Sequence, residues 1–200
     1  MSIILFSKIV TNPNSFEDHI NNFRIEKDAW MQTDLNTPFS PTDLADFPGL
    51  YYFPINSGYR YNGTLFVDSN QNEEPVSQED GNSVNLIKYG VVECTVKGIG
   101  YALTAYQNIN LPEFPGIPRA VFVPFKDASS DVDTFSSGRY LILRPQASGN
   151  AVQLDFNMAV NPFADYNNAF SGLVTSSNNV IEVSIIAGER KFNDRTRGDD

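Results

Sequence analysis

The residue types that could carry chemistry concentrate between Phe122 and Pro162, where polar side chains stand at the ends of apolar segments. If the segments that begin at Phe122 and Arg139 are neighbouring strands, Asp127 and Arg139 can meet at one end of a sheet. A buried Asp–Arg pair is usually a structural clamp. Carboxylates placed close together, such as Asp127 and Asp155, can instead perform acid–base catalysis or hold a hard cation. We favour the structural clamp and keep a catalytic or cation-binding site as the alternative.

Two sets of candidate site residues follow from this segment. The weak catalytic candidates are Asp127, Arg139 and Asp155, and the weak binding candidates are Lys126, Tyr140, Asn157 and Asn161.

Histidine and cysteine chemistry has little support, because the chain contains only His19 and Cys94. A nucleophilic triad would have to recruit His19, which we expect to be a surface polar residue near the start of a helix. One cysteine and one histidine cannot form a structural zinc site, so we expect no metal and no cofactor. Cys94 keeps period-two register with Val92 and Val96, which predicts a buried, inert thiol.

Two glycine motifs are interpreted as turns. Gly98-Ile-Gly100 is too short to cradle a phosphate, and no helix pattern follows it. Asn62-Gly63-Thr64 matches a glycosylation sequon, which matters only in an exported protein, and a turn is the favoured interpretation.

One long helix is predicted, from Phe16 to Gln32. Ser15 and Asp18 resemble a capping box at its start. The apolar residues behind the cap fall near one helical face, and Lys27 lies largely off that face. We expect the apolar stripe to dock on a sheet. The residues of the stripe are Phe16, Ile20, Phe23 and Trp30.

From Tyr51 onward the pattern is typical of β-structure, and strands follow one another without intervening helices. Lys97–Gly100 predicts a hairpin turn, Pro145–Asn150 predicts a second hairpin, and Gln71–Ser83 is expected to be a hairpin loop or a mobile segment. The predicted strands are Ile3–Val10, Tyr59–Asp68, Asn85–Val96, Tyr101–Gln107, Ala120–Phe125, Arg139–Arg144, Ala151–Phe156 and Asn178–Ala187.

These elements predict a mainly β fold, an antiparallel β-sandwich or barrel-like domain with one N-terminal amphipathic α-helix packed on it. We expect a single domain over residues 1–192, with its helix at about 16–32 and its β core at about 51–190. Residues 193–200 are expected to form a charged tail.

Composition limits the partners. The 200 residues carry a net charge of −10, which disfavours a nucleic-acid binder, because contacts to phosphates need clustered Lys and Arg. The apolar runs are far shorter than the roughly 20 residues of a membrane-spanning helix. The chain as given favours a cytoplasmic location, with export open if a signal segment has been removed. The partner is an unknown small molecule or protein, and the oligomeric state stays open.

Short motifs spread over about Phe23 to Phe192 carry a family resemblance. They are Arg24, Lys27 and Asp28; Phe39-Ser-Pro41; Gly49-Leu-Tyr51-Tyr-Phe-Pro54; Gly90; Gly98; Phe122-Val-Pro-Phe-Lys-Asp127; Gly138-Arg-Tyr-Leu141; Leu154-Asp-Phe-Asn157; Asn161-Pro162; and Ala187-Gly-Glu189. In combination they resemble the domain of unknown function 1684 family. The resemblance implies that the helix belongs to the β domain. It implies no activity, because the activity of that family is unestablished.

The chain departs from the family pattern at several polar positions. The pattern has a cysteine after Asn161-Pro162-Phe163 and later a Cys-Pro segment, and both are missing here. These losses remove polar groups from the segment that would hold a site. The departing positions are Ala164, the run Ser171–Asn179, Asp131, Ser136 and Ser137 in place of glycines, and Phe135 and Val160 in place of tyrosines.

Three functions remain in competition. The sequence favours a non-enzymatic β-scaffold protein for binding or interaction. The first alternative is a small hydrolase-like or isomerase-like enzyme that uses a carboxylate/Arg cluster of Asp127, Arg139 and Asp155, and it requires these residues to share a cleft. The second alternative is a structural or assembly protein, which would show an unpaired edge strand or a flat apolar patch.

Overall fold

The computed structural model describes residues 15–45, 47–107 and 120–192. Its one long helix, α1 (Phe16–Thr33), begins where predicted, and the Ser15 hydroxyl caps it by accepting a hydrogen bond from the Asp18 amide. A short helix, α2 (Pro41–Ala45), follows. Among the described residues, no helix is long and apolar enough to cross a membrane. The predicted strand at Ile3–Val10 and the predicted tail at 193–200 lie outside these residues.

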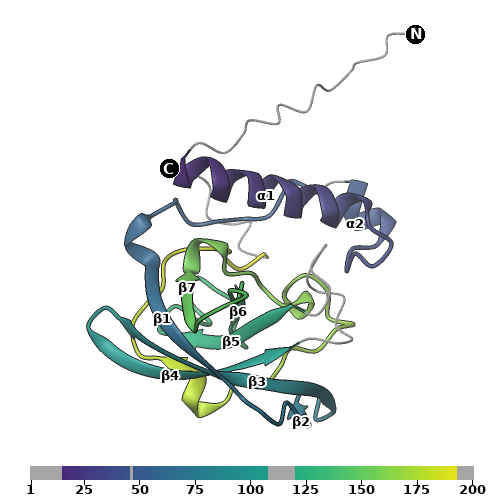
Figure 1. Cartoon of the computed structure of the whole chain (residues 1–200). Helices are drawn as coiled ribbons and strands as arrows, with labels where there is room; N and C mark the ends of the chain where they lie inside the picture. Colours follow the sequence, from purple (N-terminus) through teal and green to yellow (C-terminus); the bar gives the residue numbers. More distant parts are fainter. Residues whose placement is uncertain (1–14, 46, 108–119, 193–200) are drawn as a thin grey trace.

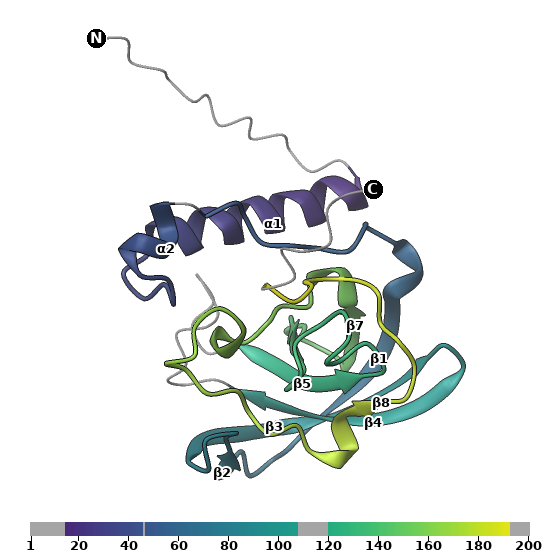
Figure 2. The same cartoon turned by 180° about the vertical axis from the view of Figure 1, so that it is seen from behind.

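The strands form one curled sheet, a half-barrel over which α1 lies (Figures 1 and 2). The strand order is β6-β5-β4-β3-β1-β7, with β2 paired to β3 and β8 paired to β5. The mainly β fold with one docked N-terminal helix is therefore confirmed. The bounds are β1 Arg60–Val67, β2 Glu73–Ser77, β3 Ser83–Val96, β4 Ile99–Gln107, β5 Val121–Asp127, β6 Arg139–Leu143, β7 Ala151–Asp155 and β8 Val180–Ile181.

Alternate residues of six strands fill the concave side of the sheet, as period-two pleating requires. Cys94 lies in this core beside Val92 and Val96, so the predicted buried thiol is confirmed, and burial raises its pKa to about 11. The long strand β3 has an irregularity between Lys88 and Gly90 in its pairing with β4. Such bulges bend a strand and increase its twist.

The predicted hairpin of β3 and β4 is confirmed, with Lys97 and Gly98 at positive φ in its turn. The second predicted hairpin is wrong. Strand β6 pairs with β5, whereas β7 pairs with β1, so these two strands are the opposite ends of the sheet path. Although a short linker joins β6 to β7, each strand pairs with another partner instead, β6 with β5 and β7 with β1. The half-barrel therefore stays open between β6 and β7. We call this opening the seam.

Three smaller expectations also need correction. Gln71–Ser83 contains strand β2, which pairs antiparallel with β3. The predicted final strand is reduced to Val180–Ile181, and it runs parallel to β5. Asn62 and Gly63 lie within β1 rather than in a turn, because β1 is paired on both sides. Strand β2 forms a local hairpin with β3, with Ser77 opposite Ser83. The other two cases depend on partner strands far away in the sequence, which local turn signals do not report.

Four short 3-10 helices complete the described chain: η1 Ser57–Tyr59, η2 Phe156–Met158, η3 Phe163–Asp165 and η4 Ser177–Asn179. Under the C-terminal half of α1, two extended segments meet, because Phe53 donates its amide to Gly188 O and Arg190 donates its amide to Tyr51 O. This pairing holds the last described residues beneath the helix.

Candidate functional site

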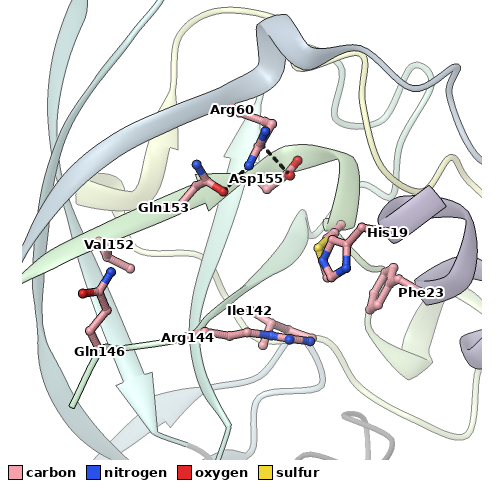
Figure 3. Close-up of a pocket in the computed structure, with 10 residues that line it drawn as sticks. His19, Phe23, Arg60, Ile142, Arg144, Gln146, Val152, Gln153 and Asp155 are labelled. Carbon is pink, nitrogen blue, oxygen red and sulfur yellow. Dashed lines mark hydrogen bonds and ion pairs between the residues drawn. The ribbon is translucent and has the colours of Figure 1, made fainter. Parts of the chain in front are cut away.

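A cavity of about 250 Å³ lies at the seam (Figure 3). Helix α1 forms one wall of it, and the edges of β6 and β7 form the others. The cavity therefore exists because β6 and β7 do not pair. Its lining residues are His19, Phe23, Arg60, Ile142, Arg144, Gln146, Val152, Gln153, Asp155 and Met158.

Helix α1 contributes His19 and Phe23, which stand four residues apart and so on the same face of the helix. Figure 3 shows both rings on the helix side of the cavity, with the Arg144 side chain extending toward them. His19 is exposed, as predicted for a surface polar residue. The half-buried side chains of Phe23 and Ile142 both pack against one apolar cluster, which includes Phe122 and Tyr140.

The charges of the cavity fall into one paired group and one open cation. Arg60 Nε lies 3.1 Å from Asp155 Oδ2, and the same guanidinium donates to Gln153 Oε1 and covers the ring of Phe16 at 4.4 Å. Arg144 is exposed and has no ion pair or hydrogen bond from its side chain among the described residues. A ligand therefore meets one neutralised Arg–Asp pair and one available guanidinium.

Because β5 and β6 are neighbours, Asp127 and Arg139 meet, as the sequence analysis allowed, and Arg139 is 0% exposed. Arg139 Nη2 lies 2.9 Å from Asp127 Oδ2, and the guanidinium also donates to the carbonyls of Ile185, Ala187 and Glu189. Burial lowers the pKa of Arg139, and the Asp127 carboxylate opposes that shift. The pair thus fastens the returning C-terminal segment to the end of β5 and β6, which is the geometry of a clamp.

The three catalytic candidates do not come together in one site. Asp155 faces the seam cavity and pairs with Arg60, whereas Asp127 bonds to Ser129, Arg139 and the amide of Ile185 inside the clamp. In the part of the chain that the structure describes, no three His, Cys, Asp or Glu side chains are grouped so as to hold a metal ion. The catalytic role of the three residues stays a prediction.

The four binding candidates lie outside the lining of the seam cavity. Asn157 is fully buried and joins two chain segments, because its side chain accepts from the Asn56 amide and donates to Asn56 O and Asp155 Oδ1. Asn161 donates to Asp165 and to Arg190 O. Tyr140 packs on Phe122 in the core.

Lys126, the fourth binding candidate, is half-buried on β5 opposite Val180 of β8. A ligand-binding role for these four residues remains a prediction.

Beneath α1 lies a buried polar network that the sequence did not reveal. Lys27 is 4% exposed and donates to Glu189, which is 1% exposed. Glu189 also accepts from the hydroxyls of Tyr52 and Tyr166 and from the amide of Asn161. Lys27 therefore faces the barrel, and its predicted position off the buried face is wrong. Spacing could have shown this, because Lys27 stands seven residues after Ile20 and four before Met31, the other buried residues of the helix.

Several ionisable groups of this network are perturbed, mainly by burial. Burial raises the pKa of Asp165 to about 7, although the amide of Phe192 donates to its carboxylate and opposes the shift. Burial also raises the pKa of Asp28 to about 6, against the amide of Leu50. The pKa values of Tyr52 and Tyr166 are raised well above the ordinary range by burial and by the nearby Glu189 charge.

The seam cavity itself had no signal in the sequence. Its cations come from the start of β1 and the end of β6, and its rings come from α1, so no local motif contains both its rings and its cations. Only the failure of β6 to pair with β7 brings these elements together.

The fold and site define a β half-barrel with a helix docked over it and a ligand-sized cavity at its seam. The model of the family described as "Protein of unknown function (DUF1684)" matches residues 45–190, so the chain belongs to this family. The solution NMR structure of an uncharacterized protein from Haloarcula marismortui is similar to this chain, with 28% sequence identity and a TM-score of 0.68. That match covers 90% of this chain and 96% of the other. No curated protein matches the chain. Neither the family nor the neighbour has an assigned function.

Proposed function

We propose that this protein is a non-enzymatic binding protein that takes a small molecule into the seam cavity. The observation that carries the proposal is the cavity itself, which combines an apolar wall with convergent polar groups at an opening of the sheet. Ligand sites are typically concave, largely apolar and furnished with a few placed polar groups. Here Phe23, Ile142 and Met158 supply apolar surface, and Arg144 supplies an open cation.

Binding is favoured over catalysis because the candidate catalytic carboxylates already have partners. A general base must lie within hydrogen-bond reach of the proton that it abstracts. Asp155 is bonded to Arg60, and Asp127 is enclosed with Arg139. An enzyme built on these residues would first have to break one of the two pairs, and that cost argues for the binding function.

The proposal is tested by a fragment screen that uses NMR, with backbone amide shifts as the readout. Small molecules that bind should move the amide signals of His19, Ile142 and Gln153. The variant Ile142→Trp, which adds bulk to the cavity wall, should abolish these shifts. The matched control Val180→Trp, on the exposed residue of β8, should leave them unchanged.

Circular dichroism and unfolding midpoints must show that both tryptophan variants fold. Gln153→Trp offers a second way to fill the cavity from an exposed position. The proposed function is wrong if no fragment moves the seam amides, or if fragments bind equally well to the filled variants.

A further inference from the structure

The seam presents unpaired main-chain groups as well as side chains. Tyr140 directs both its N–H and its C=O away from β5, since it exchanges hydrogen bonds with Val160 at 2.8 and 3.0 Å. Main-chain groups of an antiparallel strand alternate between its two edges with period two. The N–H and C=O of Ile142 therefore also point away from β5. They have no main-chain partner there among the described residues.

The facing strand offers a second such edge. The Leu65 amide donates to Asn150 O at 2.7 Å, which sets the register of β1 against β7. The same alternation directs the main-chain groups of Val152 and Leu154 toward β1 and those of Gln153 away from it. Ile142 and Gln153 both line the cavity, so the cavity lies between two strand edges whose main-chain groups have no partner within residues 15–45, 47–107 and 120–192.

A strand edge offers donors and acceptors in one plane, and its natural complement is an amide, which carries one of each. The open guanidinium of Arg144 is the complement of a carboxylate, which arginine binds through two parallel hydrogen bonds. Arg60 is neutralised by Asp155, so the cavity does not offer the paired arginines that would favour a phosphate group. The apolar wall of Phe23, Ile142 and Met158 fits an aliphatic side chain.

The cavity volume limits the size of this ligand. A volume of about 250 Å³ corresponds to roughly eight water molecules at about 30 Å³ each. That space fits one acylated amino acid, and a longer peptide would have to extend beyond the cavity.

Resting on the proposed function, we infer that the seam cavity binds an N-acyl amino acid with an aliphatic side chain. Its amide bonds to the free edge at Ile142 or Gln153, its carboxylate pairs with Arg144, and its side chain lies against Phe23. The ligand makes three separate interactions, through its amide, its carboxylate and its side chain. Each of these groups can be removed from the ligand without changing the protein.

The test is a titration of the full chain with N-acetyl-L-leucine, in which binding is measured by calorimetry and by the NMR shifts of the Ile142 and Gln153 amides. N-acetyl-L-leucinamide lacks the carboxylate, and 4-methylpentanoate lacks the amide. Both should bind at least about tenfold more weakly, because each loses a charge-assisted or main-chain hydrogen bond. Equal affinity for either analogue would overturn the inference.

The variant Arg144→Gln should weaken N-acetyl-L-leucine about tenfold and should leave the amide analogue unaffected. The control Lys88→Gln removes the same charge from β3, outside the cavity lining, and should change neither affinity. Equal losses in the two variants would mean that net charge, rather than Arg144, governs binding. A pentapeptide ending in leucine should bind more weakly than the acylated amino acid, and tighter peptide binding would contradict the size limit.

The inference and the proposed function fail separately. If other fragments occupy the cavity and N-acetyl-L-leucine does not, the ligand class is wrong and the binding function stands. If nothing occupies the cavity, both are wrong.

Discussion

The Asp165 carboxylate lies in the polar network beneath α1, where its Oδ2 accepts from the Asn161 side chain and from the Phe192 amide. Burial is the main reason that its pKa is raised to about 7. A carboxyl whose folded-state pKa exceeds its unfolded value holds its proton more tightly when folded. The resulting stability is fully present below about pH 4 and is lost as pH rises through about 7.

We therefore predict that Asp165→Asn, which keeps an oxygen acceptor and removes the titration, reduces the fall in stability between pH 5 and 8. The free energy of unfolding of the variant, relative to the native chain, should improve by roughly 2 kcal/mol over this range. Urea unfolding at several pH values measures this change. A constant difference between the two proteins across the range would contradict the shifted pKa.

Two Lys–carboxylate pairs of the chain provide a matched comparison. Lys27 and Glu189 are enclosed under α1, whereas Lys191 Nζ and Asp131 Oδ1 are 3.7 Å apart with side chains 35% and 78% exposed. Removing one partner of a buried pair leaves an uncompensated charge and costs about 3–5 kcal/mol, while an exposed pair contributes about 0–1 kcal/mol.

Lys27→Met should accordingly destabilise the protein by about 3–5 kcal/mol, and Lys191→Met should cost less than about 1 kcal/mol. The double variant Lys27→Met with Glu189→Gln should recover part of the loss, because it removes the stranded carboxylate. Denaturant unfolding of the four proteins gives the comparison. Similar costs for the two single variants would show that the Lys27 pair is not sealed.

At the scale of elements, the close pairing of β1 with β3 depends on a glycine at position 90. Gly90 on β3 faces Val67 across the β1 pairing, and a Cβ placed on Gly90 would lie 2.2 Å from Phe66 O. Because that contact is with main chain, the strands would have to separate to accommodate a side chain. The absence of a side chain at this bulge therefore allows the close approach of β1 and β3.

We predict that Gly90→Ala destabilises the protein by at least about 2 kcal/mol, the range of overpacked core substitutions. Gly100→Ala is the control, because a Cβ there has no neighbour within 4 Å, and it should change stability by no more than about 0.5 kcal/mol. Thermal or urea unfolding compares the two. Equal stability of both variants would mean that β1 and β3 can separate at little cost.

The seam cavity is formed by several elements together, and no single helix or strand contains it. Strand β6 pairs with β5, β7 pairs with β1, and α1 lies over the gap that remains. The unpaired edges that would otherwise invite association with other chains are thereby directed into a small cavity under a helix.

At the scale of the whole molecule, α1 is held to the half-barrel by contacts at both of its ends. Near its start, the ring of Phe16 lies 4.4 Å from the Arg60 guanidinium, and near its end Trp30 stacks on Phe163 with ring centroids 6.0 Å apart. Between them, Arg24 donates to Phe53 O and Lys27 joins Glu189. Such contacts support the expectation that helix and sheet form one cooperative domain.

Trp30 is the only tryptophan of the chain, so its fluorescence reports the docking of α1 alone. We predict that tryptophan fluorescence and far-ultraviolet circular dichroism follow the same urea transition, with a common midpoint. A fluorescence change at lower urea concentration would show that the helix undocks from a still-folded sheet, and it would contradict the single-domain expectation.

The sequence by itself determined the elements whose signals are local. The cap at Ser15, the helix from Phe16, the Lys97–Gly98 turn and the register of Cys94 follow from neighbouring residues and the periods of helix and strand. It also indicated that Asp127 and Arg139 can meet if their segments are neighbouring strands, and the pairing of β5 with β6 meets that condition.

Only the tertiary structure decided which strands remain unpaired, and therefore where the cavity lies. Strand pairing depends on edges far apart in the sequence, so the proximity of β6 and β7 along the chain predicted a hairpin that does not form. The burial of Lys27 likewise depends on Glu189, a partner 162 positions away. Local spacing shows only that Lys27 shares a helix face with Ile20 and Met31. Its partner Glu189 and the seam cavity are both products of distant contacts, about which local patterns carry no information.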